Sequence, residues 1–311
     1  MSYSINGITV ITTTRVATIT SATIEGFAIL GGFQGDNFGY SSGGWTPPGS
    51  NIIDRFPFAS DSNATDVGDL TSARYSGGGH SSTVRGYTSS GYGPATYSNI
   101  IDSFAFASTA NATDVGDVTV VREQGGGQSS LVSGYLSGGG SPAAGFGGNM
   151  IDKFPFAINS DATDVGDLTT ARYGQAGQSS NVSGYTSGGS SNVIDKFPFS
   201  TDSNATDVGD LTVFASQPGG GQSSSVSGYT SGDTTIDKFP FASDSNATDV
   251  GDLTQSRSMV AGISGRISGY ISGGQPPSRN TIDKFPFATD ANATDVGDLT
   301  AVRYGPVGQQ D

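Results

Sequence analysis

The stretch Asn-Ala-Thr-Asp-Val-Gly-Asp-Leu-Thr at residues 204–212 decides the fold of this chain, because it occurs six times, unchanged or nearly so. The apolar residues around the copies show no helical spacing. A repeat of 42 to 50 residues without a helical pattern is typical of β-propeller blades. We therefore expect an all-β chain of six blades. The first threonine of the stretch stands at Thr65, Thr113, Thr163, Thr206, Thr248 and Thr294.

Each blade should contain four short strands. In the copy that ends at residue 212, the segments 177–180, 182–189, 193–199 and 205–212 are separated by clusters of Gly, Ser, Asn and Asp. Short segments that alternate with such clusters are typical of strands and turns. Side chains two residues apart in a strand share a face, so Phe197 and Phe199 should lie together, and we expect them between neighbouring blades.

Composition and charge exclude several functional classes. The net charge of −14 would repel a nucleic-acid backbone and anionic lipid, so we expect neither as a partner. The absence of cysteine excludes disulfides and thiolate chemistry. No apolar run approaches eighteen residues, and residues 1–7 lack the basic start and apolar block of a secretory signal. We therefore expect neither a transmembrane helix nor a leader.

Two closures of the ring fit the sequence. In the first, residues 303–311 supply the innermost strand of the blade that residues 38–71 complete, which removes an exposed sheet edge. The propeller then spans 36–311, and residues 1–35 form an N-terminal β-rich arm or extra strands. In the second closure, residues 15–32 supply the first two strands of blade one and the C-terminus is free. We favour the first closure and leave the second open.

The glycine pairs that end the second strands resemble those of the kelch propeller repeat. They are Gly43-Gly44, Gly138-Gly139, Gly188-Gly189 and Gly273-Gly274. The tryptophan that kelch repeats carry late in the blade is replaced by Val-Gly-Asp-Leu, so the repeat is kelch-like. Over about residues 36–311, the order Gly-Tyr, Gly-Gly, Ile-Asp, Asn-Ala-Thr-Asp-Val-Gly-Asp-Leu-Thr and Arg is similar to a repeat in tail and fibre proteins of marine tailed bacteriophages. This resemblance implies a structural protein of the virion, assembled in the host cytoplasm.

Asp61, Asn63, Asp66 and Asp69 suggest calcium, because hard cations take clustered oxygen ligands. Their spacing is not that of an EF-hand loop, and Asn and Asp side chains also stabilise turns by bonding to nearby backbone. We favour turns, expect no cofactor and keep Ca²⁺ as the alternative. The Asn-Ala-Thr triplets are also formal glycosylation acceptors, and we favour turns for them too.

Five arginines recur after the fourth segment, where the fourth copy has Phe214-Ala215 instead. If the following strand is innermost, these arginines should approach the central channel and meet the aspartates of Asp-Val-Gly-Asp. Two interpretations are open: structural ion pairs, or a ring that binds an anion in the channel. The channel arginines are Arg74, Arg122, Arg172, Arg257 and Arg303.

The loops between the second and third strands vary most. In a four-stranded blade they all emerge on one face, so aromatic residues from three successive blades should form a continuous rim there. Aromatic and arginine side chains dominate binding hot spots, although unselected variation explains such loops as well. The candidate binding residues in these loops are Trp45, Tyr92, Tyr97, Phe146 and Arg279.

Catalytic groups are scarce in this chain. Its only histidine, His80, lies in a Gly-Gly-Gly-His-Ser-Ser segment where other copies have Gln, and no Ser-His-Asp set or phosphate-binding loop occurs. We expect a non-enzymatic protein of the tail, fibre or capsid surface of a phage. Its partners would be other virion proteins and a host glycan, with homo-oligomerisation left open. The alternative is a free carbohydrate-binding or adhesive propeller.

Overall fold

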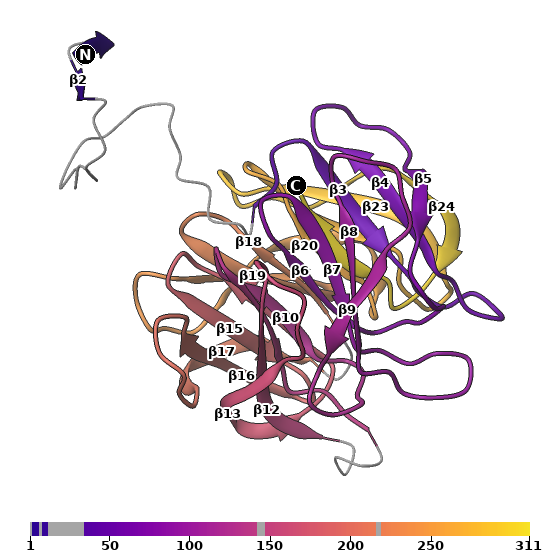
Figure 1. Ribbon diagram of the computed structural model, residues 1–311. Helices are drawn as coiled ribbons and strands as arrows, with labels where there is room; N and C mark the ends of the chain where they lie inside the picture. Colours follow the sequence, from indigo (N-terminus) through magenta and orange to yellow (C-terminus); the bar gives the residue numbers. More distant parts are fainter. Residues whose placement is uncertain (1, 6–7, 12–33, 142–146, 216–218) are drawn as a thin grey trace. The chain divides into compact units, whose positions relative to one another are not determined.

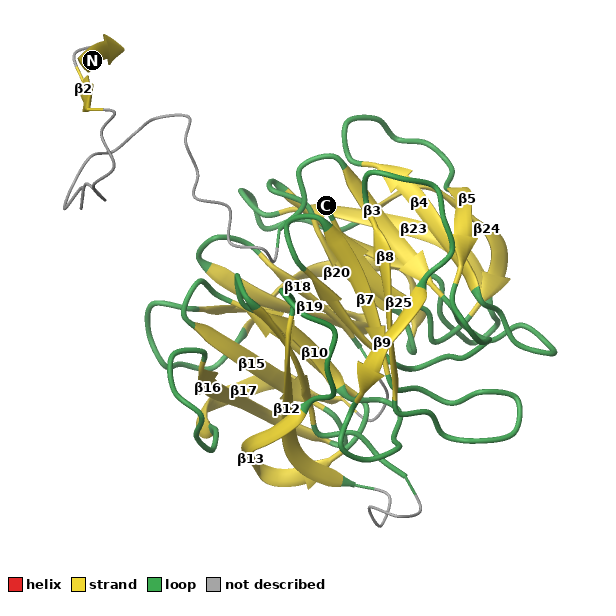
Figure 2. Ribbon diagram, viewed as in Figure 1, coloured by secondary structure: helices red, strands yellow, loops and turns green. Residues whose placement is uncertain are grey.

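The chain consists of two units, residues 1–30 and 31–311. In the first unit, β1 (Ser2–Ile5) and β2 (Ile8–Ile11) form an antiparallel hairpin. The second unit is a six-bladed β-propeller (Figure 1, Figure 2), which confirms the predicted fold. Within the described ranges, no helix is long and apolar enough to cross a membrane. The computed structural model describes residues 2–5, 8–11, 34–141, 147–215 and 219–311.

Each blade is an antiparallel sheet whose first-named strand lies nearest the axis and whose last-named strand lies at the outer edge. Blade 1 contains β25 (Val307–Gln310), β3 (Phe38–Ser42), β4 (Ile52–Pro57) and β5 (Thr65–Asp69). Blade 2 contains β6 (Gly78–Ser81), β7 (Arg85–Ser89), β8 (Ile100–Ala105) and β9 (Thr113–Asp117). Blade 3 contains β10 (Gly126–Ser129), β11 (Ser133–Ser137), β12 (Gly148–Pro155) and β13 (Thr163–Arg172).

The remaining blades follow the same plan. Blade 4 contains β14 (Gln175–Ser179), β15 (Ser183–Gly188), β16 (Ser191–Pro198) and β17 (Thr206–Ala215). Blade 5 contains β18 (Gly220–Ser223), β19 (Ser227–Pro240) and β20 (Thr248–Arg257), and β19 occupies the positions of both middle strands. Blade 6 contains β21 (Ala261–Ser264), β22 (Ser268–Ser272), β23 (Arg279–Pro286) and β24 (Thr294–Arg303).

The two ends of the propeller meet in blade 1. Strand β25 pairs with β3 from Val307↔Ser42 to Gln310↔Gly39, so the C-terminal strand is the innermost strand of the first blade. Of the two closures that fit the sequence, the structure has this one. Residues 15–32, which the other closure would use, lie outside the described residues. The closed ring leaves no blade without neighbours on both sides.

Glycines bring the six innermost strands together around the axis. A Cβ atom added to Gly177 would lie 2.7 Å from the backbone nitrogen of Gly127, in the preceding blade, and closer still to its carbonyl oxygen. Only glycine permits this approach. The same contact between neighbouring blades recurs at the other innermost strands, at Gly79, Gly127, Gly221, Gly262 and Gly308.

Hydrogen bonds accompany the glycine contacts around the ring. The backbone N–H of Ser129 donates to Oγ of Ser179 at 2.9 Å, and an equivalent bond joins every other pair of neighbouring innermost strands. The cavity at the axis has a volume of about 100 Å³ and is lined mainly by Gly and Ser. The axis therefore presents mostly backbone atoms and hydroxyl groups.

The apolar core is divided among the six junctions between blades. At the junction of blades 3 and 4, Tyr135, Ile151 and Leu168 pack against Phe197 and Phe199. The ring centroid of Tyr135 lies 5.5 Å from that of Phe197 and 4.9 Å from that of Phe199. The prediction that both phenylalanines pack between blades is therefore confirmed.

The repeated Asn-Ala-Thr-Asp-Val-Gly-Asp stretch joins the outer strands of neighbouring blades. The backbone N–H of Asp210 donates to Oδ1 of Asn246 at 3.1 Å, and Ala247 N donates to the Asp210 carbonyl at 2.8 Å. Within the stretch, Oδ1 of Asp207 accepts a bond from Gly209 N, which is an Asx turn. Gly209 has φ +152°, and a Cβ there would lie 2.6 Å from the Ser245 carbonyl oxygen. Equivalent contacts recur at every junction, with Asp161 in place of the asparagine between blades 2 and 3, which explains why the stretch recurs.

Substitution of Gly177 by Ala should destabilise the propeller by about 1–3 kcal/mol, because the added methyl group overpacks the inner ring. The control is Gly147→Ala, since the nearest atoms of the described residues to a Cβ there lie 3.6 Å away. Chemical denaturation of both variants measures the effect. Equal free energies of unfolding for the two variants would show that the inner ring is not closely packed.

Candidate functional site

The face that carries the loops between second and third strands also carries the connections from each outermost strand to the next blade. This follows from the antiparallel order, because alternate connections lie at the same end of a sheet. On this face the residue after a buried arginine pairs with the residue after a glycine pair, or after Ser90-Gly91 in blade 2. Such bridges join Trp45 to Tyr304, Tyr75 to Tyr92 and Glu123 to Gly140.

Five aromatic side chains gather at the first two of these bridges, and Tyr75 is at their centre. Its ring centroid lies 5.3 Å from that of Trp45, 5.7 Å from that of Tyr92 and 5.7 Å from that of Tyr304, all edge to face. Tyr97 extends the group, with its ring 4.8 Å from that of Tyr92. All five side chains are half-buried. We call Trp45, Tyr75, Tyr92, Tyr97 and Tyr304 the aromatic cluster.

Glu123 adds a carboxyl group to the aromatic cluster. Its Oε2 is buried and accepts no hydrogen bond from the described residues. Burial raises the pKa of Glu123 to about 7, so the group exchanges a proton near neutral pH. Burial, together with the Glu123 charge, raises the pKa of Tyr75 to about 12. The same two causes raise the pKa values of Tyr97 and Tyr304.

The aromatic cluster and Glu123 combine the features of a binding site. Half-buried rings offer apolar faces, and neutral tyrosine hydroxyls offer hydrogen bonds. A buried carboxyl oxygen without a donor is costly, and a ligand that supplies a hydroxyl or N–H would remove that cost. The site can therefore hold a ligand that is apolar on one face and carries hydrogen-bond donors.

The structure brings together only part of the expected rim. Trp45, Tyr92 and Tyr97 belong to the aromatic cluster. Phe146 lies outside the described residues. Arg279 lies in blade 6 at the start of β23, where its charge acts on Arg257.

The residues that the sequence reasoning missed are Tyr75, Tyr304 and Glu123. They follow Arg74, Arg303 and Arg122, at a position where the third blade carries Tyr173 and the fifth carries Ser258. A variable position beside arginines that recur in five blades could have indicated in the sequence that these residues have a role outside the repeated fold. The prediction omitted them because it considered only the loops between second and third strands.

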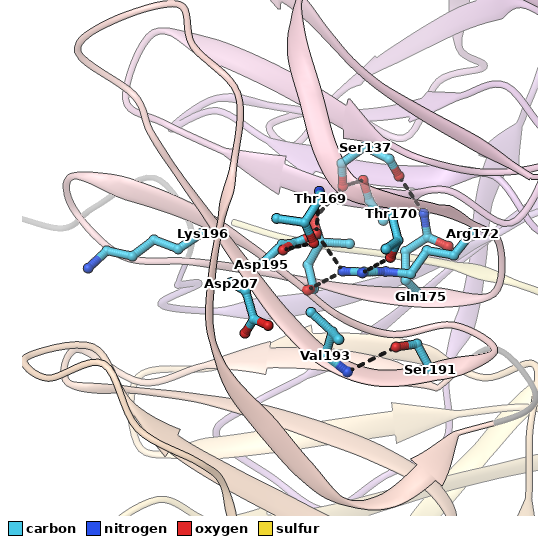
Figure 3. Close-up of polar contacts among 12 residues, drawn as sticks. Ser137, Thr169, Thr170, Arg172, Gln175, Ser191, Val193, Asp195, Lys196 and Asp207 are labelled. Atoms are coloured by element: carbon cyan, nitrogen blue, oxygen red, sulfur yellow. Dashed lines mark hydrogen bonds and ion pairs between the residues drawn. The ribbon is translucent and has the colours of Figure 1, made fainter.

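The five arginines lie between blades, and each is at most 3% exposed. Arg172 Nη2 lies 3.0 Å from Oδ2 of Asp195 in the next blade (Figure 3). It also donates to the Thr186 carbonyl. The partner is the aspartate of Ile-Asp, whereas the sequence suggested those of Asp-Val-Gly-Asp. The guanidinium groups of the five arginines therefore form structural ion pairs between blades, away from the axis. Equivalent buried pairs are Arg74–Asp102, Arg122–Asp152, Arg257–Asp283 and Arg303–Asp54.

The calcium candidates have protein partners at the outer edge of the ring. Asp61 Oδ1 accepts a bond from Lys284 Nζ at 3.0 Å, and Asn63 Oδ1 accepts one from Asp298 N at 3.1 Å. Asp66 Oδ1 accepts a bond from Gly68 N in the Asx turn. The Asp69 N–H donates to Asn111 in the next blade. Among the described residues, no group of three His, Cys, Asp or Glu is placed to hold a metal ion.

His80 is 1% exposed and stands where four other innermost strands have glutamine and β21 has Ile263. Its Nε2 lies 2.7 Å from Ser89 Oγ, and its Nδ1 lies 3.1 Å from the Gln128 carbonyl oxygen. Gln128 makes the equivalent bond, from its Nε2 to Ser137 Oγ at 2.8 Å. A carbonyl oxygen only accepts, so Nδ1 carries the proton and Nε2 accepts from Ser89. His80 thus fills a structural position.

No protein-family model matches this chain, and no curated protein is significantly similar to it. The function is therefore inferred from the geometry of the site and from the repeat.

Replacement of His80 by Gln should remove an acid-sensitive step in stability. Burial lowers the pKa of His80 from 6.5 to about 4, so the folded protein does not take up the proton that the unfolded chain binds below pH 6.5. Stability from this group is full above pH 6.5 and falls by about 3 kcal/mol as the pH drops to 4. Denaturation of both proteins at a series of pH values measures the difference, because other titrating groups are common to both. Parallel pH profiles would contradict the buried neutral histidine.

Proposed function

We propose that this chain is a non-enzymatic structural protein of a tailed bacteriophage particle, on the tail, fibre or capsid surface, and that the aromatic cluster contacts a host glycan. The observation that carries the binding role is Tyr75, which contacts three rings beside Glu123, whose Oε2 has no hydrogen-bond partner among the described residues. Sugars have apolar C–H faces that pack on aromatic rings, and hydroxyls that donate to a carboxyl group. Both features of the cluster suit such a ligand.

A binding role also accounts for where the aromatic residues occur. Tyr75 and Tyr173 both follow a buried arginine, but of the two only Tyr75 has ring contacts among the described residues, and Tyr173 is 40% exposed. The cluster thus occupies one sector of an otherwise repeated ring. Aromatic side chains gathered in one place are enriched at the centres of binding sites.

The absence of enzymatic activity is part of the proposal. Glu123 has a raised pKa, as a catalytic acid would, and burial is its cause, without a second carboxyl group of the described residues acting on it. Glycoside hydrolysis generally requires two carboxyl groups that flank the bond to be broken. His80 is buried in a neutral, structural position. These features support binding without turnover.

The position on a phage particle is supported by the resemblance of the repeat alone. A free carbohydrate-binding or adhesive propeller would use the same aromatic cluster, and it is the second candidate. In the proposal, the N-terminal unit attaches the propeller to other virion proteins. No nucleic acid or membrane is proposed as a partner, because the net charge of −14 opposes both.

Tyr75→Ala should weaken glycan binding by roughly tenfold or more, because it removes the central ring of the site. Glu123→Gln should weaken it less, since the amide still accepts one hydrogen bond. Tyr173→Ala is the matched control and should bind as the unaltered protein does. A glycan array identifies the ligand, and titration calorimetry with that ligand measures the three variants.

Failure of the unaltered protein to bind any glycan would overturn the glycan role. Equal losses of affinity in the Tyr75 and Tyr173 variants would place the binding site elsewhere. Circular dichroism and the melting temperature of each variant separate a loss of binding from a loss of folding.

A chain that lacks residues 1–30 should fold but be absent from purified phage particles, whereas the complete chain should be present. The physical reason is that these residues form a separate unit, so their removal leaves the blades intact. Mass spectrometry of particles assembled with either chain measures incorporation. Absence of the complete chain from particles would favour the free adhesive propeller. Equal incorporation of both chains would refute attachment through the N-terminal unit.

A further inference from the structure

The junction of blades 4 and 5 lacks an arginine that the other five junctions have. At each of those five, the aspartate of Ile-Asp pairs with an arginine from the preceding blade at 2.9–3.0 Å. In the strand register, Gly148 faces Arg172 and Asp233 faces Arg257, whereas Ser191 faces Ala215. Ala215 therefore stands at the arginine position, and it provides no cation.

The carboxylate at this junction is nevertheless kept. Asp237 is 2% exposed, and the equivalent aspartates of the other five blades are buried as well. Its Oδ2 accepts a bond from Thr212 N at 2.9 Å and its Oδ1 accepts one from Thr212 Oγ1 at 2.6 Å. These are the threonine bonds that every junction has, for example from Thr169 to Asp195. At Asp195, Oδ2 additionally contacts the arginine, whereas the equivalent oxygen of Asp237 has no donor among the described residues other than Thr212.

The junction of blades 4 and 5 also keeps the second hydrogen-bond acceptor that the arginine uses at the other junctions. At the other junctions the arginine Nη2 donates to a backbone carbonyl in the second strand of the next blade, such as that of Thr186 or Leu136. Thr230 occupies this place in blade 5 by its position after Tyr229. Asp237 and Thr230 line one cavity of about 20 Å³, together with Leu211, Val213, Gly219, Gly232, Asp233 and Thr235.

The two charged residues that line this cavity, Asp233 and Asp237, are both acidic. Asp233 lies in its wall, and Asp249 on β20 acts electrostatically on Asp237. Burial raises the pKa of Asp237, bonds from Thr212 oppose this, and the charge of Asp249 adds to it. A buried carboxylate is costly without a positive partner. A cavity of this size has room for one or two groups as large as water.

We propose that the cavity between Asp237 and Thr230 binds a small monovalent cation, of the size of ammonium or potassium, in the place of the missing guanidinium group. The Asp237 carboxylate supplies the negative charge, and carbonyl and hydroxyl oxygens from β19 supply further ligands. Oxygen ligands around a buried charge suit such an ion. This site is separate from the aromatic cluster and does not depend on the proposed glycan role.

Thermal unfolding at pH 7 tests the proposal, in chlorides of potassium, ammonium, sodium and tetramethylammonium at one ionic strength. Potassium or ammonium should raise the melting temperature by about 1–3 °C over tetramethylammonium, which is too large for the cavity. Asp237→Asn should abolish this difference. Asp244→Asn alters an exposed carboxylate that pairs with Lys196, and it should retain the difference.

Ala215→Arg provides an independent test, because it places a guanidinium group where five junctions have one. This variant should melt at a higher temperature than the unaltered protein and should no longer respond to the cation. Crystals grown in rubidium chloride should show an anomalous peak beside Asp237. Equal melting temperatures in all four salts without such a peak, or a cation response that persists in Asp237→Asn, would overturn the proposal even if the arginine variant fails to fold.

Discussion

A buried carboxylate at each blade junction is the constraint on which the ring depends. The aspartate of Ile-Asp is at most 2% exposed in all six blades, and its oxygens accept bonds from the threonine that ends the Asp-Val-Gly-Asp-Leu-Thr stretch of the preceding blade. A carboxylate removed from water is stable only when its partners are in place. Each blade is therefore positioned by its neighbour to within the length of a hydrogen bond, at a depth where water does not compete.

The other contacts between blades follow from that positioning. Glycines on the innermost strands meet backbone atoms of the next blade, and phenylalanines pack on the tyrosine of the blade before. The outer strands are joined by the Asn-Ala-Thr stretch. A blade thus contributes one surface to each of two junctions, and a single blade would leave both surfaces exposed. Because β25 and β3 close the ring within blade 1, the junction of blades 6 and 1 has the same glycine, phenylalanine and Asn-Ala-Thr contacts as the others.

Much of this architecture is readable from the sequence, because it depends on features that recur. The period predicts the six blades, and alternation in 193–199 predicts that Phe197 and Phe199 pack together between blades. The direction of the arginine side chains was not predictable in the same way. Arg172 and two classes of aspartate all recur once per blade, so spacing does not decide which carboxylate the arginine meets. That choice depends on depth in the sheet, where the Ile-Asp carboxylate is buried and that of Asp207 is exposed.

The candidate sites were harder to predict because they arise where a repeat departs from its neighbours in space. Glu123 stands where other blades have tyrosine or serine, and its charge acts on Tyr97, Tyr75 and Tyr304, which lie 26, 48 and 181 residues away in the sequence. Ala215 stands where arginine recurs, yet the consequence falls on Asp237 in the next blade. In both cases a residue that departs from the repeat in one blade alters the surroundings of a side chain in another blade. In a closed ring of repeats, a substitution at the end of one blade therefore changes a junction, because the residues that end a blade contact the next blade.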